Sequence, residues 1–548
     1  MPEPTSPHPP TVLKTITTSG LAHHVVDVHA VVDLEGQLSV DLDGPAEQRD
    51  RIRAALLNTA WSWPHGSIRL EREVAAGDLG ASSDLAIAIA VLVATGQAVT
   101  WPELADTLIL GELAPDGSVR TCRGVYPAVK AAKAAGLSRV IVPAENYAEA
   151  RLVDGIAVAV AGDSLQWVNT WLAGALGVDD NGPTVEPDPL GPLLITADPE
   201  SGEVTVESVS AGPHPGSPPW DRVDGIAVER ISVSEADLAE IPAHVLRAVG
   251  LAAAGGHHLI LTHESDAGYA GDVGALLVEL LPQMAPMARE EVLDLWSLAG
   301  ALDPDWSAAL DWESEMVLVL PDLLLDRLHG LPDHPTRPGY MSLAHHGVLH
   351  LADAAAIHAA GLDVVAQTLT RRSIVATGRS PYDRYPAEFQ LLATTAACPE
   401  FHTPCTCPPE ARVLHTRHID DILGAHAAIN IAATEPADTF DPDTVPTAEH
   451  VATARIRAAR RWHPASGTLH TNHSVPADTL WEATHEAFPD EVHLRIARLV
   501  ANGVLAEPHI ELVQRLMWTI ADYDGVTAPG DAQLTEALAL HLHTPKTH

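Results

Sequence analysis

The sequence predicts an α/β protein of several domains, and three observations support this fold class. A chain of 548 residues is too long for one hydrophobic core, because single cores stop growing beyond about 250–300 residues. Apolar residues make up 46% of the chain, which is ample for buried cores. Short apolar runs typical of strands alternate with segments of helical periodicity along most of the sequence.

Two stretches rich in proline and acidic residues interrupt this alternation and predict linkers. The predicted organisation is a disordered lead at residues 1–11, a first α/β domain at 12–177, a linker at 178–222, a second α/β domain at 223–433, a linker at 434–446 and a helical domain at 447–548. Within the first linker, the runs Leu193 to Thr196 and Val204 to Val209 predict a small hairpin.

The elements of the first domain follow from their periodicity. Apolar, β-branched runs predict strands, and a segment with Ile52, Ala55 and Leu56 on one face predicts a helix. One later run is almost wholly apolar, which is typical of a buried helix. The predicted elements are the strand Val25–Val32, the helices Ala46–Asn58 and Leu85–Ala94, the strand Thr107–Leu113, the helix Tyr126–Gly136 and the strand Arg139–Pro143.

The chain is strongly acidic, with a net charge of −41. Such a field repels phosphate backbones at long range and disfavours nonspecific binding of nucleic acid. We interpret the acidity as an adaptation for solubility or salt, with an acidic surface for a basic partner as the alternative. No apolar run has the length of a membrane span, and the N-terminus lacks the pattern of a secretory signal. Since four cysteines also make no disulfide framework, the sequence predicts a cytoplasmic protein without a membrane partner.

Several passages of the chain occur in the order found in one known family. They are Asp50–Leu56, Gly80–Ala88, Val140–Asn146, Ala252–Leu259, Arg337–Gly339, Ser342–Leu349 and Thr519–Asp522. As an ordered set they resemble the ComM/YifB family of Mg-chelatase-like AAA+ proteins, and the resemblance covers nearly the whole chain. It implies an N-terminal domain similar to the Lon protease fold (a ribosomal S5 domain 2-like α/β fold), a central AAA+ module and a C-terminal helical lid. It also implies hexameric rings and, for ComM-type members, a branch-migrating motor on DNA.

The resemblance places Ser82 where a Lon-type protease has its serine nucleophile. That chemistry needs a lysine to accept the serine proton, and the matching position is Tyr126. A phenol with an ordinary pKa near about 10 is a poor general base at neutral pH. Ser82 is more simply a residue at the start of a helix. We therefore predict no protease activity and no catalytic residue in this domain.

The phosphate-binding loop that the family carries has lost its chemistry here. A P-loop needs glycines whose backbone N–H groups wrap the phosphates, a lysine for their charge and a hydroxyl for Mg²⁺. By resemblance, only Gly268 keeps its identity, while the lysine position is Tyr269 and the hydroxyl position is Ala270. The same loop carries Glu264 and Asp266, whose carboxylates would repel a triphosphate.

The other motifs of nucleotide hydrolysis are replaced as well. Where the family strand ends in Asp-Glu, which hold the metal and activate water, this chain has Ala352 and Asp353. Four further positions belong to the sensors and the arginine finger. By resemblance they are Ala396, Ala427, Ala428 and Pro508, although Arg515 remains nearby. The sequence therefore predicts a pseudo-ATPase that requires no cofactor, and ATP with Mg²⁺ is not expected to bind.

Three functional hypotheses follow from this pattern. The first is a non-catalytic scaffold or regulatory protein that assembles with itself, as the family's hexameric rings imply, or with an active paralogue. The second is a divergent, ATP-binding, DNA-dependent motor. The third is a DNA-binding module without ATPase activity, which would use the basic cluster Arg455, Arg457, Arg460 and Arg461. The net negative charge weighs against nucleic acid as a partner.

One group of soft ligands lies late in the second domain. Cys398, His402, Cys405 and Cys407 fall within ten residues, and thiolates and imidazoles this close together are able to hold Zn²⁺. The spacing is not a standard C-x₂-C pair, and Glu400 occupies a position where the family has a cysteine. We therefore favour a reduced, cysteine-bearing loop and keep zinc as the alternative. The pair His257 and His258 is interpreted as packing at the start of a strand.

Overall fold

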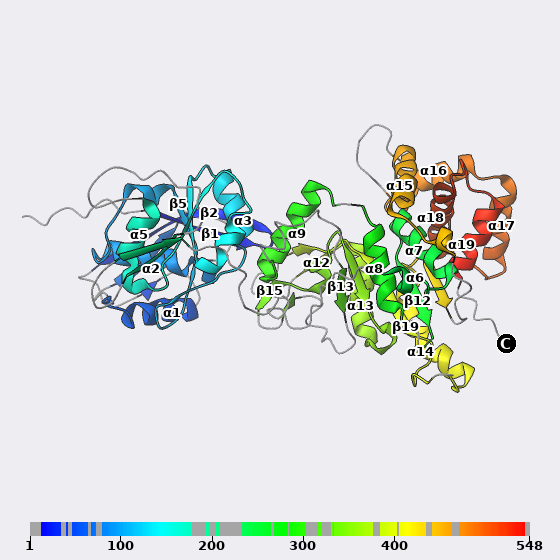
Figure 1. Ribbon diagram of the computed structural model, residues 1–548, viewed down its shortest axis with the longest axis horizontal. Coiled ribbons are helices and arrows are strands. Elements are labelled where there is room, and N and C mark those ends of the chain that lie inside the picture. Colours follow the sequence, from blue (N-terminus) through cyan, green and yellow to red (C-terminus); the bar gives the residue numbers. More distant parts are fainter. Residues whose placement is uncertain are drawn as a thin grey trace, which may run out of the picture. The chain divides into compact units, whose positions relative to one another are not determined.

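The computed structural model describes residues 12–33, 40–41, 46–63, 67–72, 79–177, 193–197, 204–208, 233–264, 268–282, 284–302, 316–319, 330–331, 334–375, 384–402, 405–433, 441–462 and 471–542. The chain groups into two compact units, each considered by itself below (Figure 1). The first is Met1–Val223 with Leu293–Leu310, and the second is Asp224–Val292 with Asp311–His548. The predicted lead and most of both predicted linkers lie outside the described residues.

The first unit contains a seven-stranded mixed sheet in the order β3-β4-β2-β1-β5-β8-β9. The pairs of β2 with β1 and with β4 are antiparallel, whereas β5, β8 and β9 pair in parallel. The strands of this sheet are β1 (Leu13–Ser19), β2 (Ala22–Asp33), β3 (Val40–Asp41), β4 (Ser67–Arg72), β5 (Thr107–Ile109), β8 (Arg139–Val142) and β9 (Ala157–Val160). The helices are α1 (Ala46–Leu57), α2 (Asp84–Ala94), α3 (Val125–Ala134), α4 (Tyr147–Ala150) and α5 (Val168–Leu176). Two short pairs are β6 (Glu112–Leu113) with β7 (Val119–Arg120) and β10 (Leu193–Ala197) with β11 (Val204–Ser208).

Helix α2 is buried along most of its length, as the apolar run Leu85–Ala94 predicts. Its first residue, Asp84, is a buried carboxylate that receives a 2.7 Å bond from Arg51 and a 2.9 Å bond from Gln48, both on α1. A negative side chain in the first turn is favourable because the N–H groups there are unpaired. This polar anchor fixes α1 against the start of α2.

The sequence prediction for this unit is confirmed for the helices α1 and α2 and for the small hairpin β10–β11. It is wrong in treating Thr107–Leu113 as one strand, because β5 ends at Ile109 and β6 starts at Glu112. Between them, the N–H of Gly111 donates to the Ser82 carbonyl and its carbonyl accepts from the N–H of Leu85. A Cβ at position 111 would meet the Leu85 side chain at 3.0 Å. The chain therefore leaves the sheet to pack closely against the start of α2.

The second unit is built on a five-stranded sheet in the order β13-β16-β19-β12-β20, in which every neighbouring pair is parallel. The strands are β12 (Leu259–His263), β13 (Met316–Val319), β16 (Val348–Leu351), β19 (Gln390–Ala396) and β20 (Ile429–Ala433). The helices that accompany them are α6 (Glu235–Leu238), α7 (Ala243–Gly255), α8 (Ala270–Leu280), α9 (Pro286–Ala299, whose last turns belong to the first unit), α12 (Tyr340–Leu343), α13 (Ala359–Arg371) and α14 (Pro409–Leu423). Short pairs are β14 (Gly330–Leu331) with β15 (His334–Pro338) and β17 (Ser373–Val375) with β18 (Arg384–Pro386). A fully parallel sheet has to be covered on both faces, which agrees with the predicted α/β alternation.

The C-terminal region is helical, as predicted, and packs into the same core as the sheet. Its helices are α15 (Ala448–Trp462), α16 (Ala477–Ala487), α17 (Asp490–Ala501), α18 (Glu507–Asp524) and α19 (Asp531–His541). Helix α18 contacts α7, α15 and α19, and Figure 1 shows these orange and red helices beside α7. Buried apolar residues of α7, β12, α15 and α18 form one continuous cluster. None of the helices in the described ranges is long and apolar enough to cross a lipid bilayer.

Candidate functional site at the carboxyl edge of the parallel sheet

The carboxyl ends of β12, β16 and β19 lie side by side in the second unit. The register pairs His263 with Ala396 and Leu351 with Ala393. In open parallel sheets, ligands bind outside the carboxyl ends of the strands. This edge is therefore the first place to look for a ligand, and it is where the sequence analysis places the family's nucleotide site.

The segment beyond β12 contains Tyr269, which the sequence analysis places at the family's lysine position. Ser265 to Ala267, which include the predicted carboxylate at position 266, lie outside the described residues. Tyr269 directly precedes α8 and is buried, at 7% exposure, in the apolar core of the unit. Its hydroxyl lies 3.5 Å from the Ala433 carbonyl and its ring centroid 6.3 Å from that of His263. The side chain at this position therefore packs inward, and Ala270 follows as the first residue of α8.

The end of β16 and the residues near it carry neutral and negative side chains. Asp353 adopts a left-handed conformation with φ of 49°, and the Thr395 hydroxyl donates to its carboxylate at 3.4 Å. His350 shares a 2.9 Å hydrogen bond with the Thr394 hydroxyl, and burial lowers its pKa to about 4. Burial also lowers the pKa of His415 on α14, against the attraction of Asp353. Imidazoles with lowered pKa values stay neutral at pH 7, so they offer no positive charge to a phosphate.

The remaining predicted positions are apolar or used elsewhere. Ala396 is 3% exposed and Ala427 and Ala428 are fully buried, and the Ala428 carbonyl lies 3.1 Å from the His541 ring. Pro508 stands in the first turn of α18. The guanidinium of Arg515 donates to the carbonyls of Asn472 at 2.9 Å and His473 at 2.6 Å and pairs with Glu511. Ala352 is half-buried at the end of β16.

The cysteine-bearing segment follows β19 at the same edge. Cys398 is fully buried, and its Sγ lies 3.7 Å from the Sγ of Cys407. The ligand atoms of Cys398, His402 and Cys407 all lie within 4.8 Å of one another. Cys405 stands two residues before Cys407 and is half-buried. The structure therefore brings together three of the four residues that the sequence analysis singled out, and Cys405 lies in the same segment of the chain.

The thiols of this cluster differ in acidity. Burial opposes ionisation of Cys398, but hydrogen bonds from Cys405 and from nearby backbone N–H groups lower the pKa of its thiol to about 7. Burial and the two neighbouring thiols raise the pKa of Cys407 to about 11. One sulfur is thus favoured as a thiolate, the form that binds metals.

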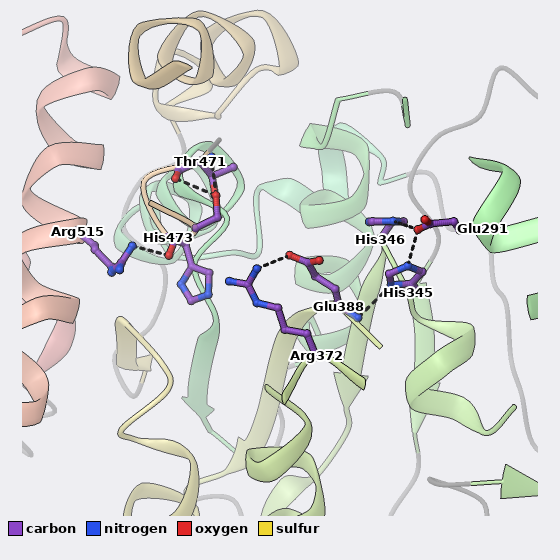
Figure 2. A network of polar contacts seen from close by, with 9 residues as sticks. Glu291, His345, His346, Arg372, Glu388, Thr471, His473 and Arg515 are labelled. Atoms are coloured by element: carbon purple, nitrogen blue, oxygen red, sulfur yellow. Dashed lines mark hydrogen bonds and ion pairs between the residues drawn. The ribbon is translucent and has the colours of Figure 1, made fainter. Parts of the chain in front are cut away.

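A second polar cluster, at the amino ends of the strands, was missed by the sequence analysis (Figure 2). Nε2 of His345 and Nε2 of His346 lie 3.1 and 3.0 Å from one carboxylate oxygen of Glu291. Hydrogen bonds from both rings overcome the cost of partial burial and lower the pKa of Glu291. Nδ1 of His345 accepts from the backbone N–H of Glu388 at 3.0 Å, and Arg372 pairs with the Glu388 carboxylate at 3.1 Å. The sequence signal was the His-His pair before β16, whose partner in α9 is distant in sequence.

This second cluster is arranged for hydrogen bonding. Because Nδ1 of His345 accepts a hydrogen bond, the neutral ring carries its proton on Nε2 and donates a hydrogen bond to Glu291. That nitrogen has no lone pair to offer a metal ion. His346 is held with φ of 60°, a conformation uncommon outside glycine. The cluster thus fixes the turn before β16.

The histidines before β12 are buried and neutral, as their predicted packing role implies. His257 shares a 2.7 Å hydrogen bond with the Thr519 hydroxyl on α18, and His258 accepts from the N–H of Leu391 at 3.0 Å. Burial lowers the pKa of His257 and of His473 to about 3 each. A Cβ at Gly255 would lie 2.3 Å from the His257 ring. These side chains connect α7, β12 and α18.

In the first unit, the two residues compared with a Lon-type site have structural partners. The Ser82 hydroxyl lies 3.5 Å from the Arg123 carbonyl. The backbone N–H of Tyr126 donates at 3.0 Å to Glu149, a buried carboxyl group whose pKa is raised by burial. The ammonium of Lys130 lies 5.1 Å from the Tyr126 ring and 3.1 Å from the Asp294 carboxylate.

The basic cluster of α15 is engaged mostly within the helical region. Arg455 donates to the Ala253 carbonyl at 2.8 and 2.6 Å, and burial lowers its pKa to about 10. Arg457 donates to the Asp522 carbonyl, and Arg461 pairs with the Asp522 carboxylate. Arg460 alone of the four is exposed. The sequence analysis recognised the cluster but not these partners.

Comparison with known families matches three models in chain order. "Subunit ChlI of Mg-chelatase" matches residues 43–146, "Magnesium chelatase, subunit ChlI" matches 237–437, and "Magnesium chelatase, subunit ChlI C-terminal" matches 442–541. The first match lies in the mixed-sheet unit. The other two cover the parallel sheet and the helical region.

Relatives of the chain span nearly its whole length. An uncharacterized protein of Mycobacterium tuberculosis, Rv2897c, is 31% identical over 542 residues, which cover 96% of this chain and 97% of the relative. The uncharacterized protein YifB of Escherichia coli is 25% identical over 458 residues, covering 79% of this chain and 78% of the relative. The competence protein ComM of Haemophilus influenzae is 27% identical over 363 residues, covering 65% of this chain and 62% of the relative.

Proposed function

Because the chain belongs to the ComM/YifB family of Mg-chelatase-like proteins, we propose that it is a family member without ATPase activity that serves as a scaffold or regulatory protein. One observation carries this proposal. Tyr269, at the position of the phosphate-binding lysine, is packed in the core with 7% exposure. A lysine there would have to hold an ammonium at the open edge of the sheet to neutralise a triphosphate.

The neighbouring strand ends support the same proposal. A metal-bound triphosphate needs a hydroxyl and a carboxylate beside the magnesium and positive groups around the γ-phosphate. The corresponding positions Ala270, Ala352 and Ala396 offer methyl groups. The carboxylate at position 353 accepts a hydrogen bond from Thr395, and the nearby imidazole of His415 has a pKa that burial lowers. The charged group among these side chains is the Asp353 carboxylate, which would repel a polyanion.

For the partner we propose self-association, as ChlI-like AAA+ proteins commonly show, or assembly with an active paralogue. Fold and family support this choice, since the sheet and the helical region form one continuous core and match the Mg-chelatase models. One relative carries the name competence protein. We therefore propose that the scaffold role belongs to competence-related DNA processing. There the protein would act together with a motor, either as a ring of its own or as a regulator.

The proposal is tested by titrating Mg²⁺-ATP into the full chain in a calorimeter, with thermal unfolding and phosphate release measured in parallel. A ligand at 100 times its Kd raises stability by about 2.7 kcal/mol, so even a weak site would raise the unfolding temperature at millimolar ATP. We expect no saturable heat, no shift and no phosphate above background. Saturable binding, or phosphate release that Asp353→Asn abolishes, would reject it.

The alternative, a DNA-dependent motor or DNA-binding module, has one observation in its favour. Arg460 leaves an exposed guanidinium on α15. The other three arginines of this cluster are engaged by carbonyls or by Asp522, and the net charge is −41. Fluorescence anisotropy with duplex and single-stranded DNA distinguishes the two proposals. Salt-sensitive binding at physiological salt that Arg460→Ala weakens would favour the DNA-binding alternative.

A further inference from the structure

The segment between β19 and α14 carries four soft metal ligands in close proximity. Their spacing is Cys398-x₃-His402-x₂-Cys405-x-Cys407. We propose that these three thiols and one imidazole bind a single Zn²⁺ ion in a tetrahedral structural site. Three cysteines with one histidine are a standard ligand set for structural zinc.

The separation of the sulfurs fits a common metal ion. With Zn–S bonds of 2.3 Å and tetrahedral angles, two coordinating sulfurs lie about 3.8 Å apart. The Sγ atoms of Cys398 and Cys407 are 3.7 Å apart. The His402 ring nitrogen closes a triangle with them in which all distances are below 4.8 Å. Small movements of the exposed His402 side chain suffice to complete a ligand shell.

The backbone turns sharply to bring His402 back to Cys398. Phe401 adopts φ of 53°, which for a bulky aromatic residue is a strained conformation. Its N–H donates to the Cys398 carbonyl at 3.2 Å, and the N–H of His402 donates to the Cys398 sulfur at 3.4 Å. Such N–H···S bonds stabilise a thiolate and are typical partners of metal-bound sulfur. Strain and sulfur hydrogen bonding thus coincide at the proposed ligands.

The two remaining ligands come from the chain just before α14. In an extended chain, side chains two residues apart point to the same side. Cys405 and Cys407 have this spacing in a non-helical stretch, in which both residues are half-buried. A C-x-C pair is therefore able to place both sulfurs on one ion, although it departs from the C-x₂-C pattern.

A bound ion would act as a clamp at the carboxyl edge of the sheet. Cys398 lies two residues beyond β19, and Cys407 lies two residues before α14. Coordination would therefore tie the end of one strand to the start of the helix that carries His415, whose ring is near Asp353 and the Ala396 carbonyl. The zinc would thus stabilise the carboxyl edge of the sheet without a nucleotide, in agreement with the proposed function.

The first test measures metal directly in the full chain, purified under reducing conditions without chelator. Elemental analysis should find about one zinc per chain. The variants Cys398→Ser and Cys407→Ser should lose most of it. Cys122→Ser is the matched control, because Cys122 is a buried free thiol of the first unit, and it should keep the full zinc content. Zinc that is absent from the wild type, or retained equally in all variants as an adventitious ion, would overturn the proposal.

A second test uses the wild type alone, so that loss of zinc through misfolding of a variant does not affect the result. Titration with a mercurial reagent should release zinc as three thiols react, which a metallochromic dye reports. Exchange with Co²⁺ should produce the intense visible bands of a tetrahedral site together with thiolate charge-transfer absorption. Thiols that react without releasing metal, or a weak octahedral cobalt spectrum, would reject the site.

Discussion

At the scale of single residues, the buried histidine His350 makes the second unit sensitive to acid. Its pKa is lowered to about 4 by burial, whereas an unfolded histidine has about 6.5. The folded state therefore binds fewer protons, and the stability from this residue is present above about pH 6.5 and lost as pH falls toward 4. The loss at pH 4.5 amounts to about 2–3 kcal/mol.

His350→Gln should reduce this acid sensitivity, because glutamine keeps a polar atom near Thr394 and takes up no proton. Urea unfolding at pH 7 and at pH 4.5 measures the change in the free energy of unfolding. Part of the acid loss should persist, since burial lowers the pKa of His541 to about 4 as well. The exposed His485 provides the control His485→Gln, which should behave as the wild type. An unchanged acid loss in His350→Gln would contradict the assignment.

The carboxylate of Asp522 on α18 is a buried ion-pair partner in the helical region. It is 1% exposed, is paired with Arg461 and accepts a 2.9 Å bond from Asn472. Arg461 also lies 4.1 Å from the Trp518 ring. Removing one partner of a buried pair leaves an uncompensated charge, which costs about 3–5 kcal/mol.

Asp522→Ala should therefore lower the free energy of unfolding by several kcal/mol, measured by denaturant unfolding. The matched control is Asp421→Ala, which breaks the ion pair of Asp421 with Arg417 at 3.5 Å, where both side chains are about two-thirds exposed. Exposed pairs contribute about 0–1 kcal/mol. Equal effects of the two substitutions would show that burial does not govern these pairs.

At the scale of elements, the ends of the parallel strands and the helices after them decide what the edge of the sheet is able to bind. Between β12 and α8, Tyr269 packs in the core at the position where we predict that the family has a lysine. After β19, the cysteine segment connects to α14. Tyr269 and the cysteine segment follow β12 and β19, which are neighbouring strands of one sheet. The proposed loss of phosphate binding and the proposed zinc site therefore concern the same edge of the sheet.

Restoring the P-loop residues alone should not restore nucleotide binding. The double substitution Tyr269→Lys with Ala270→Thr removes a packed ring and introduces an ammonium at a core position, at a cost of about 2–5 kcal/mol. The strand ends at Ala352 and Ala396 would still lack the metal and sensor groups. We expect lower stability in unfolding experiments and no heat on titration with Mg²⁺-ATP.

Tyr269→Phe is the control for this experiment. It keeps the ring and removes only the hydroxyl, which lies 3.5 Å from the Ala433 carbonyl. Such a long contact contributes little, and we expect a change of at most about 1 kcal/mol. If the double substitution bound Mg²⁺-ATP at micromolar concentration, the edge would have kept an ATP site that lacked only these two residues.

At the scale of the whole molecule, the proposed scaffold should assemble independently of nucleotide. A motor couples its assembly to nucleotide because its ligand binds one assembly state more tightly than another. A chain without that ligand has no such coupling. The mass of the assembly, as a multiple of the 58.0 kDa chain, should be the same with and without Mg²⁺-ATP. Native mass spectrometry measures this, and an ATP-dependent change in mass would contradict the scaffold proposal.

Much of the fold was predictable from the sequence because local periodicity depends on burial. The apolar run that became α2 and the strand runs that became β2 and β8 need a buried environment whatever surrounds them. The strand predicted over residues 107–113 was wrong because Gly111 pairs with the start of α2, a contact distant in sequence. Local patterns do not contain such pairings.

The candidate site was predictable only as a set of residue identities. The sequence predicts that lysine, hydroxyl and arginine are missing at the family's positions, and it determines that four soft ligands lie within ten residues. Tertiary structure decided that Tyr269 turns into the core, that the thiols of Cys398 and Cys407 meet, and that Glu291 reaches His345 and His346. The physical reason is that residue types set which interactions are available, whereas distances between side chains far apart in sequence depend on how the strands and helices pack.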